Sequence, residues 1–350
     1  NFQGAGPQAR AGLSLCFCRR AFENSDNETV KTIIDTGPEG EKMDYQLELI
    51  DVAKQYKEFL AVDSVNLQIE KGEIVSFLGA SGCGKTTTLR MIAGLIEPTR
   101  GTIRIQGRDM NGIPPHKRDI SMVFQNYALF PHLSVYENIV YGLKTRKIKD
   151  KKVLMEKARE MMNLVQLEGV ENRLPKELSG GQQQRVSLAR AMIVEPKVML
   201  FDEPLSNLDA KLREKTRVEI RNLLKKMNVT AIYVTHDQEE ALTISDRIAV
   251  MNKGRIEQIT EPSSLYTRPA TRFIAGFVGH ANIVEGSVTK ATEDRFAVKL
   301  TSGEEIWAKA DPVKKAAAGD GAVLIIRPEN IRLHDEKPDK SNILSGTVKA

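Results

Sequence analysis

The segment from residue 79 to residue 86 reads Gly-Ala-Ser-Gly-Cys-Gly-Lys-Thr and fits the pattern G-x-x-x-x-G-K-[ST]. Glycines in such a loop let successive backbone N–H groups point at phosphate oxygens, and the following helix adds the positive end of its dipole. There, Lys85 neutralises β- and γ-phosphates and the Thr86 hydroxyl ligates Mg²⁺. The predicted phosphate-binding residues are Gly79, Ala80, Ser81, Gly82, Cys83, Gly84, Lys85, Thr86 and Thr87.

A glycine-rich turn without a ligand is the alternative interpretation of this loop. The flanking residues argue against it, because the apolar run 74–78 predicts a buried strand before the loop and residues 85–94 predict a helix after it. A phosphate-binding loop requires this strand–loop–helix order.

Two carboxylates, Asp202 and Glu203, directly follow another apolar run at 198–201. Ligands of α/β proteins lie at the carboxyl ends of the strands, so Asp202 is expected beside the phosphate loop, where it can hold Mg²⁺. Glu203 can then polarise the attacking water as a general base. Alone, such a pair is more often a solvated strand end, and only the upstream loop favours the catalytic interpretation.

The residues Leu178-Ser179-Gly180-Gly181-Gln182 precede a predicted helix at 183–193. A serine and two glycines at a helix N-terminus can form a second anion-binding cap, or an ordinary N-cap. A phosphate-loop kinase or a small GTPase needs no second cap of this kind.

This set of motifs resembles the ATPase subunits of ABC transporters over residues 45–280. The resemblance implies that ATP held by the phosphate loop of one subunit is capped by the LSGGQ segment of the other. The segment residues are Ser179, Gly180, Gly181 and Gln182. The chain is therefore expected to pair, as a homodimer or with another ATPase subunit, around two ATP molecules with Mg²⁺.

Four further residues take their expected roles from the same resemblance. Tyr56 matches the aromatic residue that stacks on adenine, and Gln125 matches the glutamine that reaches Mg²⁺ and the attacking water. Asp209 matches the loop that links the two sites across the dimer, and His236 matches the histidine that contacts the γ-phosphate. Without the other motifs, Tyr56 would be assigned to packing and His236 to a strand end at the surface.

Composition excludes several classes of protein. The 350 residues are 41% hydrophobic and 28% charged, with no apolar run of 18 residues, so no bilayer span is expected. A net charge of +5 is too diffuse to indicate nucleic acid. Three cysteines, Cys16, Cys18 and Cys83, argue against a disulfide framework and for a reducing compartment.

The chain divides into three predicted parts. Residues 1–42 are expected to be a disordered tail, with a targeting peptide as the alternative. Residues 45–280 are expected to form an α/β P-loop ATPase domain with a helical subdomain at about 126–180. Residues 281–350 are expected to form a small OB-like regulatory β-barrel, incomplete in this sequence.

Short apolar runs define the strands of that β domain. The predicted strands are 283–288, 296–300, 305–308, 323–326, 331–333 and 346–348. In the ATPase domain, strands are expected at 46–50, 197–201 and 231–234, a hairpin at 248–251 and 256–259, and a helix at 210–227.

Two segments, 127–133 and 327–331, resemble importers of maltose, spermidine/putrescine, iron and phosphonate. The resemblance implies a peripheral protein on the cytoplasmic face of a bacterial plasma membrane. Its partners would be integral membrane permease subunits and, indirectly, an extracytoplasmic solute-binding protein. A polyamine-type solute is expected first, with iron, phosphonate or sugar as alternatives.

Three other functions were weighed against this one. An ABC ATPase outside transport usually has two ATPase domains or a long coiled-coil insert, and neither is evident. LSGGQ and His236 argue against a phosphate-loop kinase. A non-catalytic regulatory module would lack Lys85 or Glu203, and both are present.

Overall fold

The computed structural model describes residues 14–16, 45–292, 295–309, 317–332 and 342. The chain forms two compact units, which divide between Pro262 and Ser263. One unit holds residues 31–262, and the other holds 263–350 together with the N-terminal residues 1–30.

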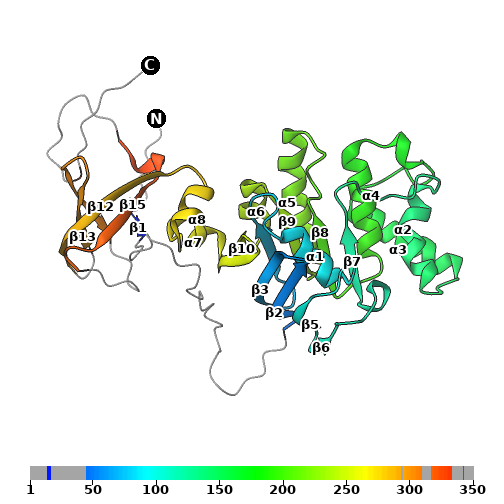
Figure 1. The fold of residues 1–350 in the computed structure, drawn as a ribbon. Coiled ribbons are helices and arrows are strands. Elements are labelled where there is room, and N and C mark those ends of the chain that lie inside the picture. The colour runs from blue at the N-terminus through cyan, green and yellow to red at the C-terminus, as the bar shows by residue number, and fades with distance from the viewer. Residues whose placement is uncertain (1–13, 17–44, 293–294, 310–316, 333–341, 343–350) are drawn as a thin grey trace, which may run out of the picture. The chain divides into compact units, whose positions relative to one another are not determined.

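The larger unit is built on a six-stranded sheet with the order β11-β10-β4-β9-β8-β7 (Figure 1). All strands are parallel except β11, which forms a hairpin with β10. The strands are β4 (Ile74–Leu78), β7 (Ile120–Val123), β8 (Val198–Asp202), β9 (Thr230–Thr235), β10 (Arg247–Asn252) and β11 (Arg255–Thr260). This sheet confirms the predicted α/β class, with each predicted strand lying within about two residues of its position.

Alternate residues of the parallel strands face two separate cores. In β8, Met199 and Phe201 join a core with the helices, whereas Val198 and Leu200 join a core with a second sheet. Strands buried on both faces read as continuous apolar runs, and this explains why the sequence predicts them so directly.

The second sheet is antiparallel and has the order β3-β2-β5-β6. Its strands are β2 (Leu47–Tyr56), β3 (Phe59–Ile69), β5 (Arg100–Ile105) and β6 (Arg108–Asp109). Only the start of β2 was predicted. The missed strands are half-exposed and interrupted by register shifts, so they lack a clean alternating pattern.

Helices of the larger unit fall into two groups. The first, α2 (Val135–Thr145), α3 (Lys151–Leu164) and α4 (Gly180–Met192), pack on one another and extend past the predicted limit of the helical subdomain at residue 180. The others are α1 (Lys85–Ala93), which contacts β8 and β9, and the adjacent pair α5 (Ala210–Lys226) and α6 (Gln238–Ile244). None of the helices in the described ranges is long and apolar enough to cross a membrane.

The smaller unit is a five-stranded barrel with the order β1-β14-β13-β12-β15 (Figure 1). Its strands are β1 (Ser14–Cys16), β12 (Asn282–Ala291), β13 (Arg295–Leu300), β14 (Glu305–Lys309) and β15 (Gly321–Ile326). β1 is antiparallel to β15 and parallel to β14.

β1 lies within the segment expected to be a disordered tail. β1 lies in register with three residues of β15 and one of β14, so it covers part of the exposed edges of these two strands. Apart from Ser14–Cys16, the residues of the expected tail 1–42 lie outside the described residues, as does the strand expected at 346–348. The strand expected at 331–333 was wrong for Ile331 and Arg332, which follow the 3₁₀ turn Pro328–Asn330 without joining the sheet.

A buried arginine ties the barrel to the helices α7 (Pro262–Thr267) and α8 (Arg272–Phe277). Arg327 is 5% exposed and donates to the carbonyls of Ala275, Val278 and Tyr266. Its guanidinium lies 4.1 Å from the centre of the Tyr266 ring, and the Tyr266 hydroxyl donates to Glu329. These contacts place 263–280 with the barrel, whereas the sequence had assigned those residues to the ATPase domain.

Candidate nucleotide site

The loop between β4 and α1 has little room for side chains at two of its glycines. A Cβ at Gly79 would lie 2.3 Å from the Met251 carbonyl oxygen. Gly84 has φ +103° and would bring a Cβ within 2.7 Å of the Ala61 carbonyl oxygen. Gly84 is also the residue before the first turn of α1, so the tight turn leads straight into a helix N-terminus.

Lys85 begins α1 and is 5% exposed. Its ammonium donates to the carbonyl oxygens of Gly79 at 2.7 Å and Ala80 at 3.0 Å. The lysine charge is therefore held inside the loop by the same backbone that a phosphate would approach.

Parallel pairing brings three strand ends to one edge of the sheet. Leu78 of β4 is in register with Thr235 of β9, and Asp202 of β8 is in register with Val234. At this edge the Thr86 hydroxyl donates to Asp202 Oδ1 at 3.2 Å. Burial raises the pKa of Asp202, an effect that the hydrogen bond from Thr86 opposes.

Glu203 and His236 meet at the same edge. His236 Nδ1 lies 3.1 Å from Glu203 Oε2, with 58% of the histidine side chain and 24% of the glutamate side chain exposed. Glu203 has φ +46°, a left-handed conformation that costs a non-glycine residue free energy. Its N–H donates to the Val234 carbonyl at 3.0 Å, which anchors this strained turn.

Gln125 follows β7, whose last residue Val123 is in register with Phe201 of β8. The Gln125 carbonyl accepts a hydrogen bond from Asn207 Nδ2 at 2.8 Å. Gln125 therefore starts at the same edge as Asp202, and its backbone is fixed to the loop that follows Glu203.

The segment after Gln125 is held by α4. The Tyr127 carbonyl accepts from the Ser187 hydroxyl at 2.9 Å and from Arg190 at 3.0 Å, and the Ala128 carbonyl accepts from Arg190 at 2.8 Å. The Arg190 guanidinium also lies 5.4 Å from the centre of the Phe130 ring. Because Ser179 starts α4, one helix connects the LSGGQ segment to residues 127–130.

Ser179 and Asp209 are both exposed N-cap residues. Ser179 accepts from the Gln182 N–H at 3.4 Å, and Asp209 accepts from the Leu212 N–H at 2.9 Å. Tyr56 ends β2 with 43% of its surface exposed, and the Lys54 ammonium lies 5.2 Å from its ring centre.

The predicted site residues thus divide into two groups. Strand register and hydrogen bonds bring together Lys85, Thr86, Asp202, Glu203, His236 and Gln125. Across the described ranges, no hydrogen bond or ion pair joins Tyr56, Ser179 or Asp209 to that group. Asn207 was not predicted from the sequence, because its partner Gln125 is 82 residues away in the chain.

The chain is similar in sequence to several known proteins. The family model described as ABC transporter matches residues 62–206. The chain is 49% identical over 285 residues to the spermidine/putrescine import ATP-binding protein PotA of Rubrobacter xylanophilus, covering 81% of this chain and 75% of the relative. It is 48% identical over 298 residues to the Fe(3+) ions import ATP-binding protein FbpC of Brucella melitensis, covering 85% and 82%.

A solved structure also resembles the chain. It is described as the dimeric post-hydrolysis state of the ATP-binding cassette MJ0796 bound to ADP and Pi. The TM-score is 0.55 at 33% identity, and the match covers 62% of this chain and 98% of that one.

The phosphate loop, the acidic strand end and the parallel sheet define an ATPase of the P-loop class. The similarity to PotA and FbpC proteins over most of their length goes further: the chain belongs to the ABC transporter family, as the sequence motifs had predicted.

Proposed function

We propose that this protein binds and hydrolyses ATP with Mg²⁺ to drive import of a solute through a membrane transporter. The observation that carries the proposal is the Glu203–His236 contact at the same sheet edge as the Thr86–Asp202 pair and the phosphate loop. The two PotA and FbpC relatives, both import ATP-binding proteins by name, support the direction of transport.

In the proposed reaction, Lys85 exchanges its two backbone carbonyls for β- and γ-phosphate oxygens. Glu203 accepts a proton from the attacking water, and His236, which contacts Glu203, donates to the γ-phosphate. Phosphoryl transfer needs positioning and charge neutralisation more than covalent chemistry, and these side chains supply both.

Mg²⁺ fits the donors present. The Thr86 hydroxyl and the Asp202 carboxylate lie 3.2 Å apart, and the Gln125 amide follows the neighbouring strand. Oxygen ligands and a coordination shell shared with phosphates and water are what Mg²⁺ prefers, and the bound ion neutralises phosphate charge. Among the described residues no group of three His, Cys, Asp or Glu side chains is placed to hold a metal ion, so the proposed site relies on phosphate and water oxygens as further ligands.

We propose that two copies, or this chain and a related ATPase subunit, close around two ATP molecules. Ser179 and Gly180 are exposed at the start of α4, where they are available to the partner's nucleotide. The similar cassette MJ0796 is described as dimeric, which supports this assembly.

The partners proposed for the assembly are integral membrane permease subunits at the cytoplasmic face of a bacterial plasma membrane. The segment 127–133 is the proposed contact, since Ser187 and Arg190 would pass its movement to α4. The five-stranded barrel is proposed to be the OB-like regulatory domain of such importers. A polyamine is the first candidate solute because of PotA, and iron is the second because of FbpC.

The test of the catalytic assignment is Glu203→Gln in the purified chain. Hydrolysis should fall about 10²- to 10³-fold while ATP binding persists, because the base is lost and the phosphate contacts remain. The variant should also accumulate as an ATP-bound dimer, measured by size-exclusion chromatography.

The companion variant is Lys85→Ala, which should lose ATP binding as well as turnover. Near-wild-type hydrolysis by Glu203→Gln would refute the base assignment.

A separate experiment tests the solute. Stimulation of ATP hydrolysis by a permease complex with a binding protein loaded with spermidine, but not with Fe(3+), would select the polyamine over iron.

A further inference from the structure

A buried glutamate lies behind His236. Glu240 of α6 is 3% exposed. Its Oε2 accepts hydrogen bonds from the Tyr233 hydroxyl at 3.1 Å and the Thr235 hydroxyl at 2.8 Å. Both donors belong to β9, the strand that ends immediately before His236, so this carboxylate is bonded to the strand that carries the histidine.

Both neighbours of His236 are held by this arrangement. The Thr235 oxygen also accepts from the Asp237 N–H at 2.9 Å. Asp237 in turn caps α6 by accepting from the N–H groups of Glu239 at 2.8 Å and Glu240 at 3.2 Å. The histidine ring itself is exposed, so the position of His236 is set by its neighbours rather than by packing of its own side chain.

One arginine of α5 reaches this turn and a second loop. Arg213 Nη1 lies 3.5 Å from Asp237 Oδ2, and its Nε lies 3.9 Å from Glu240 Oε1. Its Nη2 donates to the carbonyl of Leu208, the residue before Asp209, at 3.0 Å. A single guanidinium therefore contacts both the turn around His236 and the loop that ends at Asp209.

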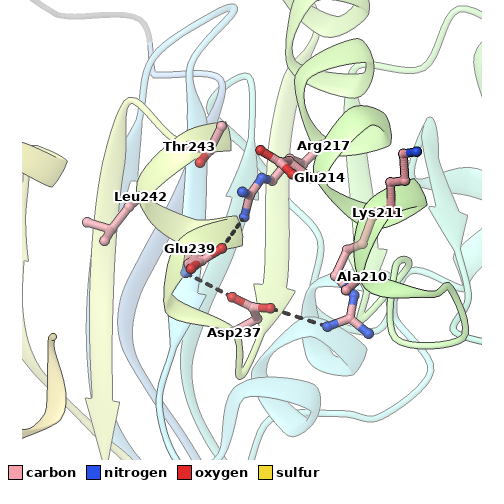
Figure 2. Close-up of a pocket in the computed structure, with 9 residues that line it drawn as sticks. Ala210, Lys211, Glu214, Arg217, Asp237, Glu239, Leu242 and Thr243 are labelled. Atoms are coloured by element: carbon pink, nitrogen blue, oxygen red, sulfur yellow. Dashed lines mark hydrogen bonds and ion pairs between the residues drawn. The ribbon is translucent and has the colours of Figure 1, made fainter.

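The contacts of Arg213 with the two carboxylates are loose. Arg213 Nε is buried and has no hydrogen-bond partner among the described residues. Close guanidinium–carboxylate pairs have distances of about 2.7–2.9 Å, so both ion-pair contacts have room to shorten. A cleft of about 630 Å³ beside them, lined by residues of α5 and α6 such as Lys211 and Thr243, leaves space for that movement (Figure 2).

A second ion pair joins the same two helices without touching either loop. Arg217 Nη1 lies 3.0 Å from Glu239 Oε2, as the dashed line between them in Figure 2 marks. Arg217 is one helical turn beyond Arg213 in α5. This pair serves as an internal control. If an ion pair between α5 and α6 were sufficient to support hydrolysis, removing the Arg217–Glu239 pair would lower turnover as much as removing the Arg213 contacts.

We infer that Glu240 and Arg213 are positioning residues that hold His236 for hydrolysis and tie its turn to the loop ending at Asp209. The inference rests on the proposed function, in which His236 and Glu203 act on the γ-phosphate and the attacking water. A displacement of the loop at Asp209 moves Arg213, and Arg213 moves the backbone of His236 through Asp237 and Glu240.

The first test is steady-state ATP hydrolysis by the full chain carrying Glu240→Gln or Arg213→Gln. Either change should lower kcat about 10- to 100-fold and leave the KM for ATP within about twofold, because misplacing a reacting group affects the transition state more than binding. Glu239→Gln should match the wild type. The double variant should lose no more than the worse single variant, because the two residues act as one unit.

Readouts other than turnover separate positioning from loss of folding. Equilibrium ATP affinity should stay unchanged, and Asp237 amide hydrogen exchange without nucleotide should be faster in Glu240→Gln than in Glu239→Gln. Should Glu240→Gln fail to fold, Thr235→Val keeps the side-chain shape, removes the linking hydroxyl and should reproduce both effects.

Wild-type kcat in Glu240→Gln and Arg213→Gln would overturn the inference, as would additive losses that come with a raised KM. Glu203→Gln and His236→Ala are measured in parallel. If they lose hydrolysis while Glu240→Gln keeps it, only the inference fails. If Glu203→Gln and His236→Ala hydrolyse ATP like the wild type, the proposed function fails together with the inference.

Discussion

At the scale of single residues, two adjacent carboxyl groups at the end of β8 experience different surroundings. Asp202 is partly buried next to the Thr86 hydroxyl, whereas Glu203 turns away through a left-handed backbone conformation to reach His236. Successive side chains of an extended strand point to opposite faces, and the left-handed turn at Glu203 changes the direction that its side chain would otherwise take. One carboxylate can thus serve a metal while the next serves a water.

The raised pKa of Asp202 has a consequence for stability. Burial lifts the folded-state pKa above the usual 3.8, so the unfolded chain ionises first as the pH rises. The contribution of Asp202 to the free energy of unfolding is therefore fully present below pH 3.8 and is lost as the pH rises through the folded-state pKa.

We therefore expect Asp202→Asn to raise the thermal midpoint at pH 7, because the amide still accepts from Thr86 but places no charge in this partly buried position. The variant should also lose hydrolysis, because the amide carries no charge for Mg²⁺. The gain in midpoint over the wild type should vanish near pH 3.8. Glu160→Gln, which neutralises an exposed carboxylate on α3, is the control and should show neither effect. A lower midpoint for Asp202→Asn at pH 7 would contradict the assignment.

At the scale of elements, the helix that follows the phosphate loop is capped by a distant arginine. Arg118 is 2% exposed and donates to the carbonyls of Met91 and Ile92 in the last turn of α1, and to the Ile113 carbonyl. The last carbonyls of a helix have no partner within its regular hydrogen-bond pattern, and here a side chain 26 and 27 residues further on donates to two of them. The Met91 carbonyl also accepts from the Gly94 N–H. Burial lowers the pKa of this guanidinium.

Arg118→Met should destabilise the protein by about 3 kcal/mol, because three carbonyls inside the protein lose a hydrogen bond from the charged guanidinium. Urea unfolding would measure the loss. Arg108→Met, at an exposed arginine of β6, should change stability by less than about 0.5 kcal/mol. Equal stability of the two variants would mean that the carbonyls of α1 find other donors.

The elements of the fold differ in how well the sequence predicts them. Asp202 and His236 come at the ends of apolar runs, and Lys85 follows another such run after a short glycine-rich loop, so the sequence placed them near the edge of the predicted sheet. The role of His236 came from the family resemblance. Arg118, Asn207 and Glu240 were missed because their partners are distant in the sequence or follow no regular spacing. The antiparallel sheet was missed because its half-exposed strands carry an irregular pattern, and β1 because its three residues pair only with the other end of the chain.

At the scale of the whole molecule, the division between Pro262 and Ser263 determines which fragments can fold. Residues 263–280 contain Ile274 and Ala275, both fully buried, and the carbonyls of Ala275 and Val278 bond to Arg327. A cut after residue 280 would separate α7 and α8 from these partners.

Limited trypsin digestion should reveal this dependence. A fragment 45–280 should be cut after Arg272 faster than the full chain, because both helices would lose their packing. A fragment 45–262, which lacks this site, should unfold cooperatively. The full chain is the control. Equal resistance of fragment 45–280 and the full chain to cleavage after Arg272 would contradict the boundary.

The ammonium of Lys85 donates to two carbonyl oxygens of its own loop, so the loop itself already holds a positive charge. Nucleotide entry is then a substitution, in which one set of charge-assisted hydrogen bonds replaces another. The affinity measures only the difference between the two sets, so it depends as much on the oxygens the lysine leaves as on those it gains. A mutation that alters the path of the backbone at Ala80, and touches no phosphate, would for that reason still retune the site.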